Sequence, residues 1–132
     1  MFISSRNVTF FSVGLISSSL FFVNAGSALA ACFDPPGPGV DWRGCDKRGI
    51  DLAGANMRAM NLEHTNLMGA NLYKVDLTEA NLWSAYLWDA NLAGANLRNA
   101  NLLGAYLRNA YLADAIWEDG RVCGSESYGE CE

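Results

Sequence analysis

The residue types that carry most enzyme chemistry are sparse in this sequence. His64 is the only histidine, and Glu63 and Thr65 are its direct neighbours. A lone histidine has no second imidazole with which to hold a metal ion, so we expect a solvated side chain. The sequence shows no Ser/His/Asp set, no phosphate-binding glycine loop and no CxxC pair. We therefore expect no enzyme activity, no cofactor and no metal site.

Cysteine is the remaining residue type with chemistry, and the chain has four: Cys32, Cys45, Cys123 and Cys131. In an oxidising compartment four cysteines allow three full pairings. The simplest is local, with Cys32 joined to Cys45 and Cys123 joined to Cys131. Alternatively Cys45, which occupies an alanine-type position of the repeat described below, is an inert buried thiol. That arrangement would leave Cys32 free for lipidation.

The elements that position these residues follow from a five-residue repeat. Every fifth residue from Leu52 to Trp117 is large and apolar, and twelve of these fourteen are leucine. The residue two places earlier is alanine in ten of the fourteen pentads, and the residue between them is Asn or Asp in ten. Steps of five would scatter the leucines around an α-helix, and a continuous strand needs a period of two. The repeat therefore fits neither regular element.

Each pentad instead predicts three extended residues and a corner, as in Ala90-Asn91-Leu92-Ala93-Gly94. Alanine and leucine, two apart, point to one side of the extended trio, and Asn points to the other. The last two residues are often of types that tolerate turns. Four such corners close a square of about 20 residues, with about 4.8 Å between coils. Leucines and alanines then fill the interior, and Asn or Asp side chains stack in ladders outside.

This pattern, seen in Ala80-Asn81-Leu82, Ala95-Asn96-Leu97 and Ala100-Asn101-Leu102, resembles the A-N/D-L-x-x motif of the pentapeptide-repeat family. The resemblance covers residues 40–119, or sixteen pentads. It implies an all-β fold, a right-handed quadrilateral β-helix, and the repeat length gives about four coils.

The first thirty residues predict a secretory signal peptide, residues 1–30. Arg6 precedes an apolar run from Val8 to Val23, and Ala28-Leu29-Ala30 supplies small residues before a cleavage site. The run is short for a membrane span. We expect an exported protein, periplasmic or secreted.

A second processing route stays open at the same place. Leu29-Ala30-Ala31-Cys32 also resembles a bacterial lipobox, which would put a lipid on Cys32 and anchor the chain to an envelope membrane. Against this route, the polar stretch from Asn24 to Ser27 separates the apolar run from the cysteine. Soluble export is the favoured alternative, and membrane contact is expected only with lipidation.

The ends of a solenoid expose apolar core and unpaired edges, so they need caps. Residues 31–39 form a Pro/Gly-rich N-terminal segment, and residues 120–132 a disulfide-closed C-terminal cap without pentads. Trp42 and Trp117 are expected to close the two ends of the leucine column. Lys47 puts an amine at an inward position, so we expect an irregular first coil with regular packing from Ile50.

Charge argues against nucleic acid as a partner. Seven acids and seven bases lie between Val40 and Ala113, whereas a nucleic-acid binder needs a basic stripe. Some pentapeptide-repeat proteins are DNA mimics that bind gyrase, a role that implies a cytoplasmic, evenly negative rod. A mimic that inhibits or protects a topoisomerase is therefore the alternative function, and the less favoured one.

A 20-residue coil would stack outward residues into columns and gather aromatic side chains on one side. Tyr86 would lie against Tyr106, and Trp83 against Leu103. Met68, Trp88 and Arg108 would share the neighbouring corner column. Tyr73 and Tyr111 are expected on the next side. Exposed Trp and Tyr edged by Arg are typical of interaction hot spots, although stacked aromatics can also simply stabilise a sheet.

These residues predict a binding face: Trp83, Tyr86, Trp88, Tyr106, Met68, Leu103 and Arg108. The predicted function is a non-catalytic, exported structural or protein-binding module of the cell envelope. The partner would be a protein or a second copy of the chain, and a glycan would also suit Trp and Tyr rings.

Overall fold

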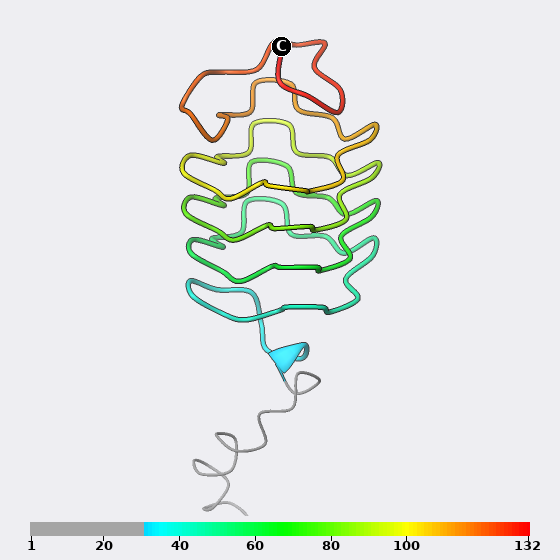
Figure 1. Cartoon of the computed structure of the whole chain (residues 1–132), viewed down its shortest axis with the longest axis vertical. Helices are drawn as coiled ribbons and strands as arrows, with labels where there is room; N and C mark the ends of the chain where they lie inside the picture. The colour runs from blue at the N-terminus through cyan, green and yellow to red at the C-terminus, as the bar shows by residue number, and fades with distance from the viewer. Residues whose placement is uncertain (1–30) are drawn as a thin grey trace, which may run out of the picture.

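The computed structural model describes residues 31–132 as one stack of coils (Figure 1). The predicted signal peptide, residues 1–30, lies outside the described residues. Within residues 31–132 the extended parts are single β-bridges, one for each pentad, rather than longer strands. This follows from the repeat, because a corner interrupts the chain after every three extended residues.

The bridges are parallel and join residues that are 20 apart. One column runs through Asp41, Asn61, Asn81 and Asn101. Within it the Leu82 N–H donates to Asn101 O at 2.9 Å, and the Asn101 N–H donates back to Ala80 O at 2.9 Å. The expected all-β solenoid with a 20-residue coil is confirmed. Its right-handed sense and the count of about four coils stay expectations from the repeat.

From Trp42 to Ala115 each corner is a tight turn in which the third residue has a positive φ. The Ala85 N–H, for example, donates to Leu82 O at 3.0 Å, and Ser84 between them has a φ of 54°. A positive φ at only that position is the type II pattern, which explains the many corner glycines.

The core consists of stacked leucine and alanine layers. Leu62, Leu82, Ala85 and Leu87 are completely buried, and most other central and alanine positions are buried with them. The partly buried ones lie in the coils near the two ends: Ile50, Ala55, Ala105, Leu107 and Trp117. Thr65 replaces an alanine inside this core, and its hydroxyl donates to Trp42 O at 2.7 Å. The hydrogen bond satisfies the one polar group that the substitution buries.

The expectation of an irregular first coil is wrong. Asp41 and Asp46 already bridge Asn61 and Asn66 in the regular register. The Lys47 ammonium is accommodated at the end of the core, where Nζ donates to Cys32 O at 2.7 Å and lies 3.8 Å from the Trp42 ring centroid. Burial lowers the pKa of Lys47. The sequence predicted an irregular coil because it does not show that Cys32 O and the Trp42 ring lie within reach of the Lys47 ammonium.

The two ends of the stack are closed differently. Trp42 is fully buried, and its indole N–H donates to Asp34 O at 3.1 Å, so the segment before Gly39 covers the ring. Trp117 is only half-buried. At this C-terminal end the tail turns back and forms antiparallel bridges, Tyr111 with Tyr128 and Ile116 with Val122.

Disulfides close both terminal segments. Cys32 is bonded to Cys45, and Cys123 is bonded to Cys131. This is the local pairing, and it excludes the alternative of an inert Cys45 thiol. Cys45, Cys123 and Cys131 are buried against the core.

Candidate binding face

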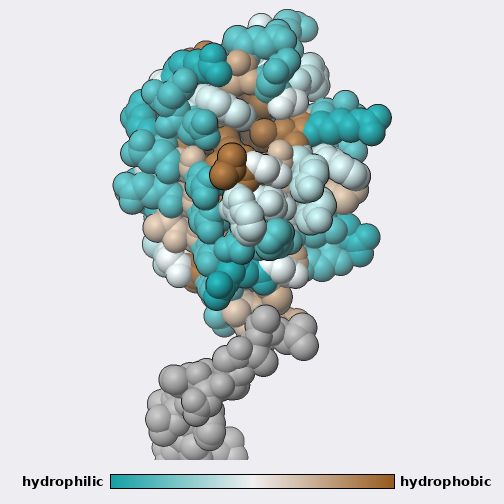
Figure 2. Space-filling model, viewed as in Figure 1, coloured by the Kyte–Doolittle hydropathy of each residue, from teal (hydrophilic) through white to brown (hydrophobic). Residues whose placement is uncertain are grey.

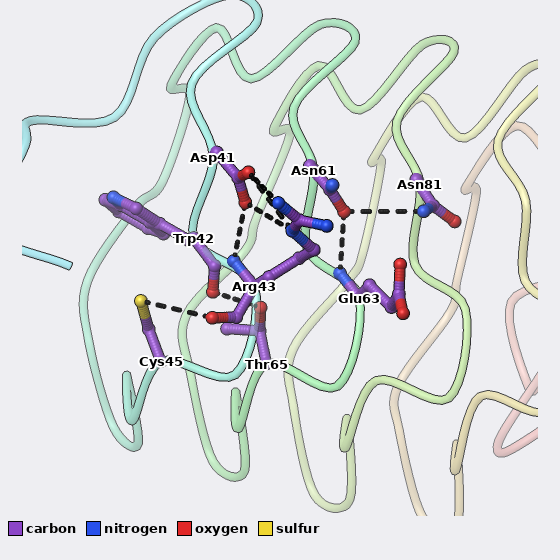
Figure 3. A network of polar contacts seen from close by, with 8 residues as sticks. All are labelled: Asp41, Trp42, Arg43, Cys45, Asn61, Glu63, Thr65 and Asn81. Carbon is purple, nitrogen blue, oxygen red and sulfur yellow. Dashed lines mark hydrogen bonds and ion pairs between the residues drawn. The ribbon is translucent and has the colours of Figure 1, made fainter. Parts of the chain in front are cut away.

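On most of the surface the outward Asn and Asp side chains form a regular ladder of hydrogen bonds, and the candidate face is where this ladder is interrupted. Asn61 Oδ1 accepts a hydrogen bond from the Glu63 N–H at 3.2 Å, and Asn81 Nδ2 donates to the same oxygen at 3.3 Å (Figure 3). In the first coil Asp41 Oδ1 accepts the Arg43 N–H at 3.0 Å in the same way. The outward Asx residue therefore caps the first amide of the corner that follows it.

Two tyrosines interrupt this ladder on one side of the coil stack. Tyr86 and Tyr106 occupy the positions that follow Asp46 and Asn66 in their column, and a phenol cannot form the Asx turn. The two rings instead stack with centroids 4.9 Å apart and an interplanar angle of 6°. The neighbouring corner amides, those of Trp88 and Arg108, lose the side-chain cap that Asn66 gives Met68 at 3.2 Å.

Trp88 extends the stacked pair into a cluster. Its ring makes edge contacts with Tyr86 at 6.4 Å and with Tyr106 at 6.1 Å between centroids. Tyr86 and Trp88 are half-buried, whereas Tyr106 is 45% exposed. Tyr86 and Trp88 are therefore fixed by packing, whereas Tyr106 leaves part of the cluster exposed to a partner.

Trp83 lies at the corner that precedes Tyr86 and is 38% exposed. Its ring contacts the His64 ring edge-on with centroids 4.8 Å apart, and His64 Nε2 lies 3.9 Å from Glu63 Oε1. The expectation of a merely solvated His64 missed the Trp83 contact, because the two residues become neighbours only through the coil register.

The other predicted residues edge this cluster. Leu103 is 71% exposed, Arg108 is exposed and Met68 is half-buried. Met68, Trp88 and Arg108 follow one another along a corner column, since the Gly69 N–H donates to Trp88 O and the Asp89 N–H to Arg108 O. We call Trp83, Tyr86, Trp88 and Tyr106, with Met68, Leu103 and Arg108 at their edges, the aromatic face.

Tyr111 belongs to a second aromatic pair and not to this cluster. It stacks on Tyr128 with centroids 4.9 Å apart. Tyr73, 43% exposed, has the Lys74 ammonium 5.1 Å from its ring centroid. Tyr128 escaped the sequence reasoning because it lies in the tail, where no repeat indicates which residues become neighbours.

No group of three or more His, Cys, Asp or Glu side chains in residues 31–132 is arranged to hold a metal ion. The same range contains no helix with the length and apolar character needed to cross a membrane.

On the surface seen in Figure 2, strongly hydrophobic atoms gather in the upper half of the molecule, towards the C-terminal end, among hydrophilic ones.

Solved structures with similar coordinates are pentapeptide repeat proteins. One from the thylakoid lumen of Arabidopsis thaliana has a TM-score of 0.58 and 29% identity, over 65% of this chain and 59% of its own. The fluoroquinolone resistance protein QnrB1 has a TM-score of 0.40 and 20% identity, over 67% of this chain and 55% of its own. A protein from Nostoc has a TM-score of 0.29 and 32% identity, over 58% of this chain and 81% of its own.

This chain spans less than two thirds of the length of the Arabidopsis protein and of QnrB1. No curated protein matches the sequence.

The family is established by a sequence profile. The profile described as Pentapeptide repeats matches in eight copies, over residues 48–83 and 76–114. These residues make up just over half of the chain, and the 20-residue register agrees with them. The chain belongs to the pentapeptide-repeat family.

Proposed function

We propose that this protein is an exported, non-catalytic module that binds a protein partner through the aromatic face. The observation that carries the proposal is the replacement of two ladder residues by Tyr86 and Tyr106. Both lie where ten of the fourteen pentads place Asn or Asp, and both join Trp88 in one aromatic cluster.

Stability alone gives little reason for these two tyrosines. Each one removes a corner cap of the kind Asn66 provides, which is a loss of about 1 kcal/mol. The stacked ring pair returns about 0.5–1.5 kcal/mol in total. The two lost caps amount to about 2 kcal/mol, slightly more than the stacked pair returns, so the exchange gains exposed aromatic surface rather than stability. Such surface, with Trp and Tyr at its centre and Arg at its edge, has the composition of interface hot spots.

Two observations support export. The described cysteines form two disulfides, which is typical of an oxidising compartment. The similar Arabidopsis protein is described as a protein of the thylakoid lumen. The bond between Cys32 and Cys45 uses the sulfur that a lipid would need, so it favours soluble export over lipid anchoring.

The binding proposal is tested by restoring the ladder. The variant Tyr86→Asn/Tyr106→Asn removes the stacked pair and puts back the residue type that caps the corner. We expect its midpoint of thermal unfolding to stay within a few degrees of wild type. Its capture of cross-linked partners from the native exported fraction should fall about tenfold, the effect of losing one hot spot.

Tyr73→Asn is the matched control, since it removes an exposed tyrosine from a different corner column. It should capture the same partners as wild type. Unchanged capture by the double variant, together with a clear fall in its unfolding midpoint, would show that the tyrosines serve stability and would refute the proposal.

Export is tested by the intact mass and N-terminal sequence of the protein from fractionated native cells. A chain that starts at Ala31 and is lighter by two hydrogens per disulfide is the expected result. A lipid on Cys32 would make the protein a membrane-anchored module. An uncut, reduced chain in the cytoplasm would contradict export and revive the DNA-mimic alternative.

A further inference from the structure

The C-terminal tail covers only one half of the last coil. Three amides there find acceptors in the tail: Leu112 N–H with Ser127 O at 2.9 Å, Asp114 N–H with Cys123 O at 3.1 Å, and Trp117 N–H with Arg121 O at 2.8 Å. The tail thus replaces the coil that would come next, and Leu112 beneath it is completely buried.

The other half of this coil is an open edge from Ala100 to Gly104, whereas Gly129 of the tail lies over the corner of Leu107 and Asn109. One coil lower, the amides of Leu82, Ser84, Leu87 and Asp89 donate to carbonyls of the coil above at 2.8–3.0 Å. Their equivalents in the last coil have no such backbone acceptor within residues 31–132: Leu102, Gly104, Leu107 and Asn109. The carbonyls of Ala80 and Ala85 accept from Asn101 and Tyr106, whereas no described backbone amide donates to those of Ala100 and Ala105.

A hollow of about 430 Å³ adjoins this edge. Its lining includes Leu102, Leu103, Leu107 and Trp117, with Glu118 at the rim. Leu102 is 9% exposed and Leu107 is half-buried, although Leu82 and Leu87 below them are fully buried. The apolar interior of the solenoid therefore lies nearer the surface here than one coil lower, chiefly at Leu107.

The chain segment that follows this edge is acidic. Six acids and the single base Arg121 lie between Ala113 and Glu132, and Arg121 Nε lies 3.4 Å from Asp119 Oδ2. Arg98 from the coil below also reaches this corner, since its Nε would lie 3.6 Å from a Cβ at Gly120. Glu118 lines the hollow directly. A second copy would bring an equally acidic tail to the same place, so charge disfavours self-association there and favours a basic partner.

We propose that the edge from Ala100 to Gly104 binds an extended peptide segment with a large apolar side chain between basic ones. The peptide backbone would pair with the free amides of Leu102 and Gly104 and with Ala100 O, as an added strand does. Its apolar side chain would enter the hollow over Leu102 and Trp117. Its basic side chains would face Glu118 and the acidic tail. This site lies at the end of the solenoid and shares only the edge residue Leu103 with the aromatic face.

The test uses the purified, oxidised protein and a capped peptide, Lys-Val-Lys-Leu-Lys, as the probe. At a peptide concentration about ten times the Kd, we expect hydrogen exchange of the Leu102 and Gly104 amides to slow about tenfold, in proportion to occupancy, and the binding to weaken at high salt. Glu118→Lys should weaken binding about tenfold by charge reversal. Glu118→Gln, a milder change, should weaken it less.

Glu79→Lys is the matched control, because Glu79 is an exposed acid on the same side of the solenoid, two coils lower. It should bind the peptide like wild type, and so should Tyr86→Asn/Tyr106→Asn. The latter result separates this site from the aromatic face.

Three results would overturn the proposal. The first is no protection of Leu102 and Gly104 at about 1 mM peptide, where even a weak specific site is half-filled. The second is equal protection by the peptide with glutamate in place of lysine. The third is protection that rises with protein concentration without peptide, because a second copy would then occupy the edge.

Discussion

The third residue of each corner is the place where single side chains differ most in conformational cost. Gly54 has a φ of 72°, and a Cβ added to it would meet no atom within 4 Å. Ala59, one corner later, has a φ of 55° with a side chain attached. Because the left-handed region is unfavourable for residues with a Cβ, the same geometry is relaxed at Gly54 and strained at Ala59.

This contrast gives a reciprocal prediction. Ala59→Gly should raise the free energy of unfolding by about 1 kcal/mol, since it relieves a strained φ without removing a core contact. Gly54→Ala should lower it by about 1 kcal/mol for the opposite reason. Urea unfolding of both variants measures these changes. Equal effects of the same sign would mean that φ does not determine the cost at the corners.

At the scale of one element, the Asn ladder links successive coils. Asn81 takes part in three hydrogen bonds: it caps the Trp83 amide at 3.2 Å, donates to Asn61 at 3.3 Å and accepts from Asn101 at 3.0 Å. Asn66 caps the Met68 amide at 3.2 Å, and it lies below Tyr86, which supplies no amide to extend the ladder. Both side chains are half-buried, so they differ mainly in the bonds between coils.

We therefore expect Asn81→Ala to destabilise the protein by roughly 1 kcal/mol more than Asn66→Ala does. The comparison of their urea midpoints isolates the contribution of the ladder, because each variant loses one corner cap. Equal destabilisation would show that the bonds between coils add nothing in water. The same result would weaken the argument that Tyr86 and Tyr106 were gained at a structural cost.

At the scale of the whole molecule, the fold is a stack in which each coil contacts only its neighbours. Stability in such a stack is the sum of local terms, and the end coils depend on their caps. The C-terminal cap is held by the bond between Cys123 and Cys131 and by backbone pairs to Leu112, Asp114 and Trp117. Damage to this cap should therefore remain near the end of the stack.

Cys123→Ser/Cys131→Ser should lower the free energy of unfolding of the cap by about 2–3 kcal/mol, the value for a loop of this length. Hydrogen exchange should then rise first at Leu112 and Asp114, whereas Leu62 and Leu67 keep their wild-type rates. A uniform rise along the chain would contradict this, since it would show that the solenoid unfolds as one unit.

The sequence by itself determined the repeating part of this protein. A period of five with leucine, alanine and Asn in fixed places allows one packing, in which 20 residues close a coil and residues 20 apart become neighbours. That register predicted the contact of Tyr86 with Tyr106, as well as the Met68, Trp88 and Arg108 column. The prediction succeeded because in a repeat every pentad has the same surroundings, so local pattern and tertiary contact carry the same information.

Only the tertiary structure decided what happens where the repeat ends. The Lys47 ammonium fits the first coil because it donates a hydrogen bond to Cys32 O and lies over the Trp42 ring. No sequence pattern predicts these two contacts. The choice among three disulfide pairings and the contact of Tyr111 with Tyr128 depend on how the terminal segments fold back. The open edge at Leu102 follows from the path of a tail with no periodicity. Outside the repeat, neighbours are set by chain direction and packing rather than by spacing along the sequence.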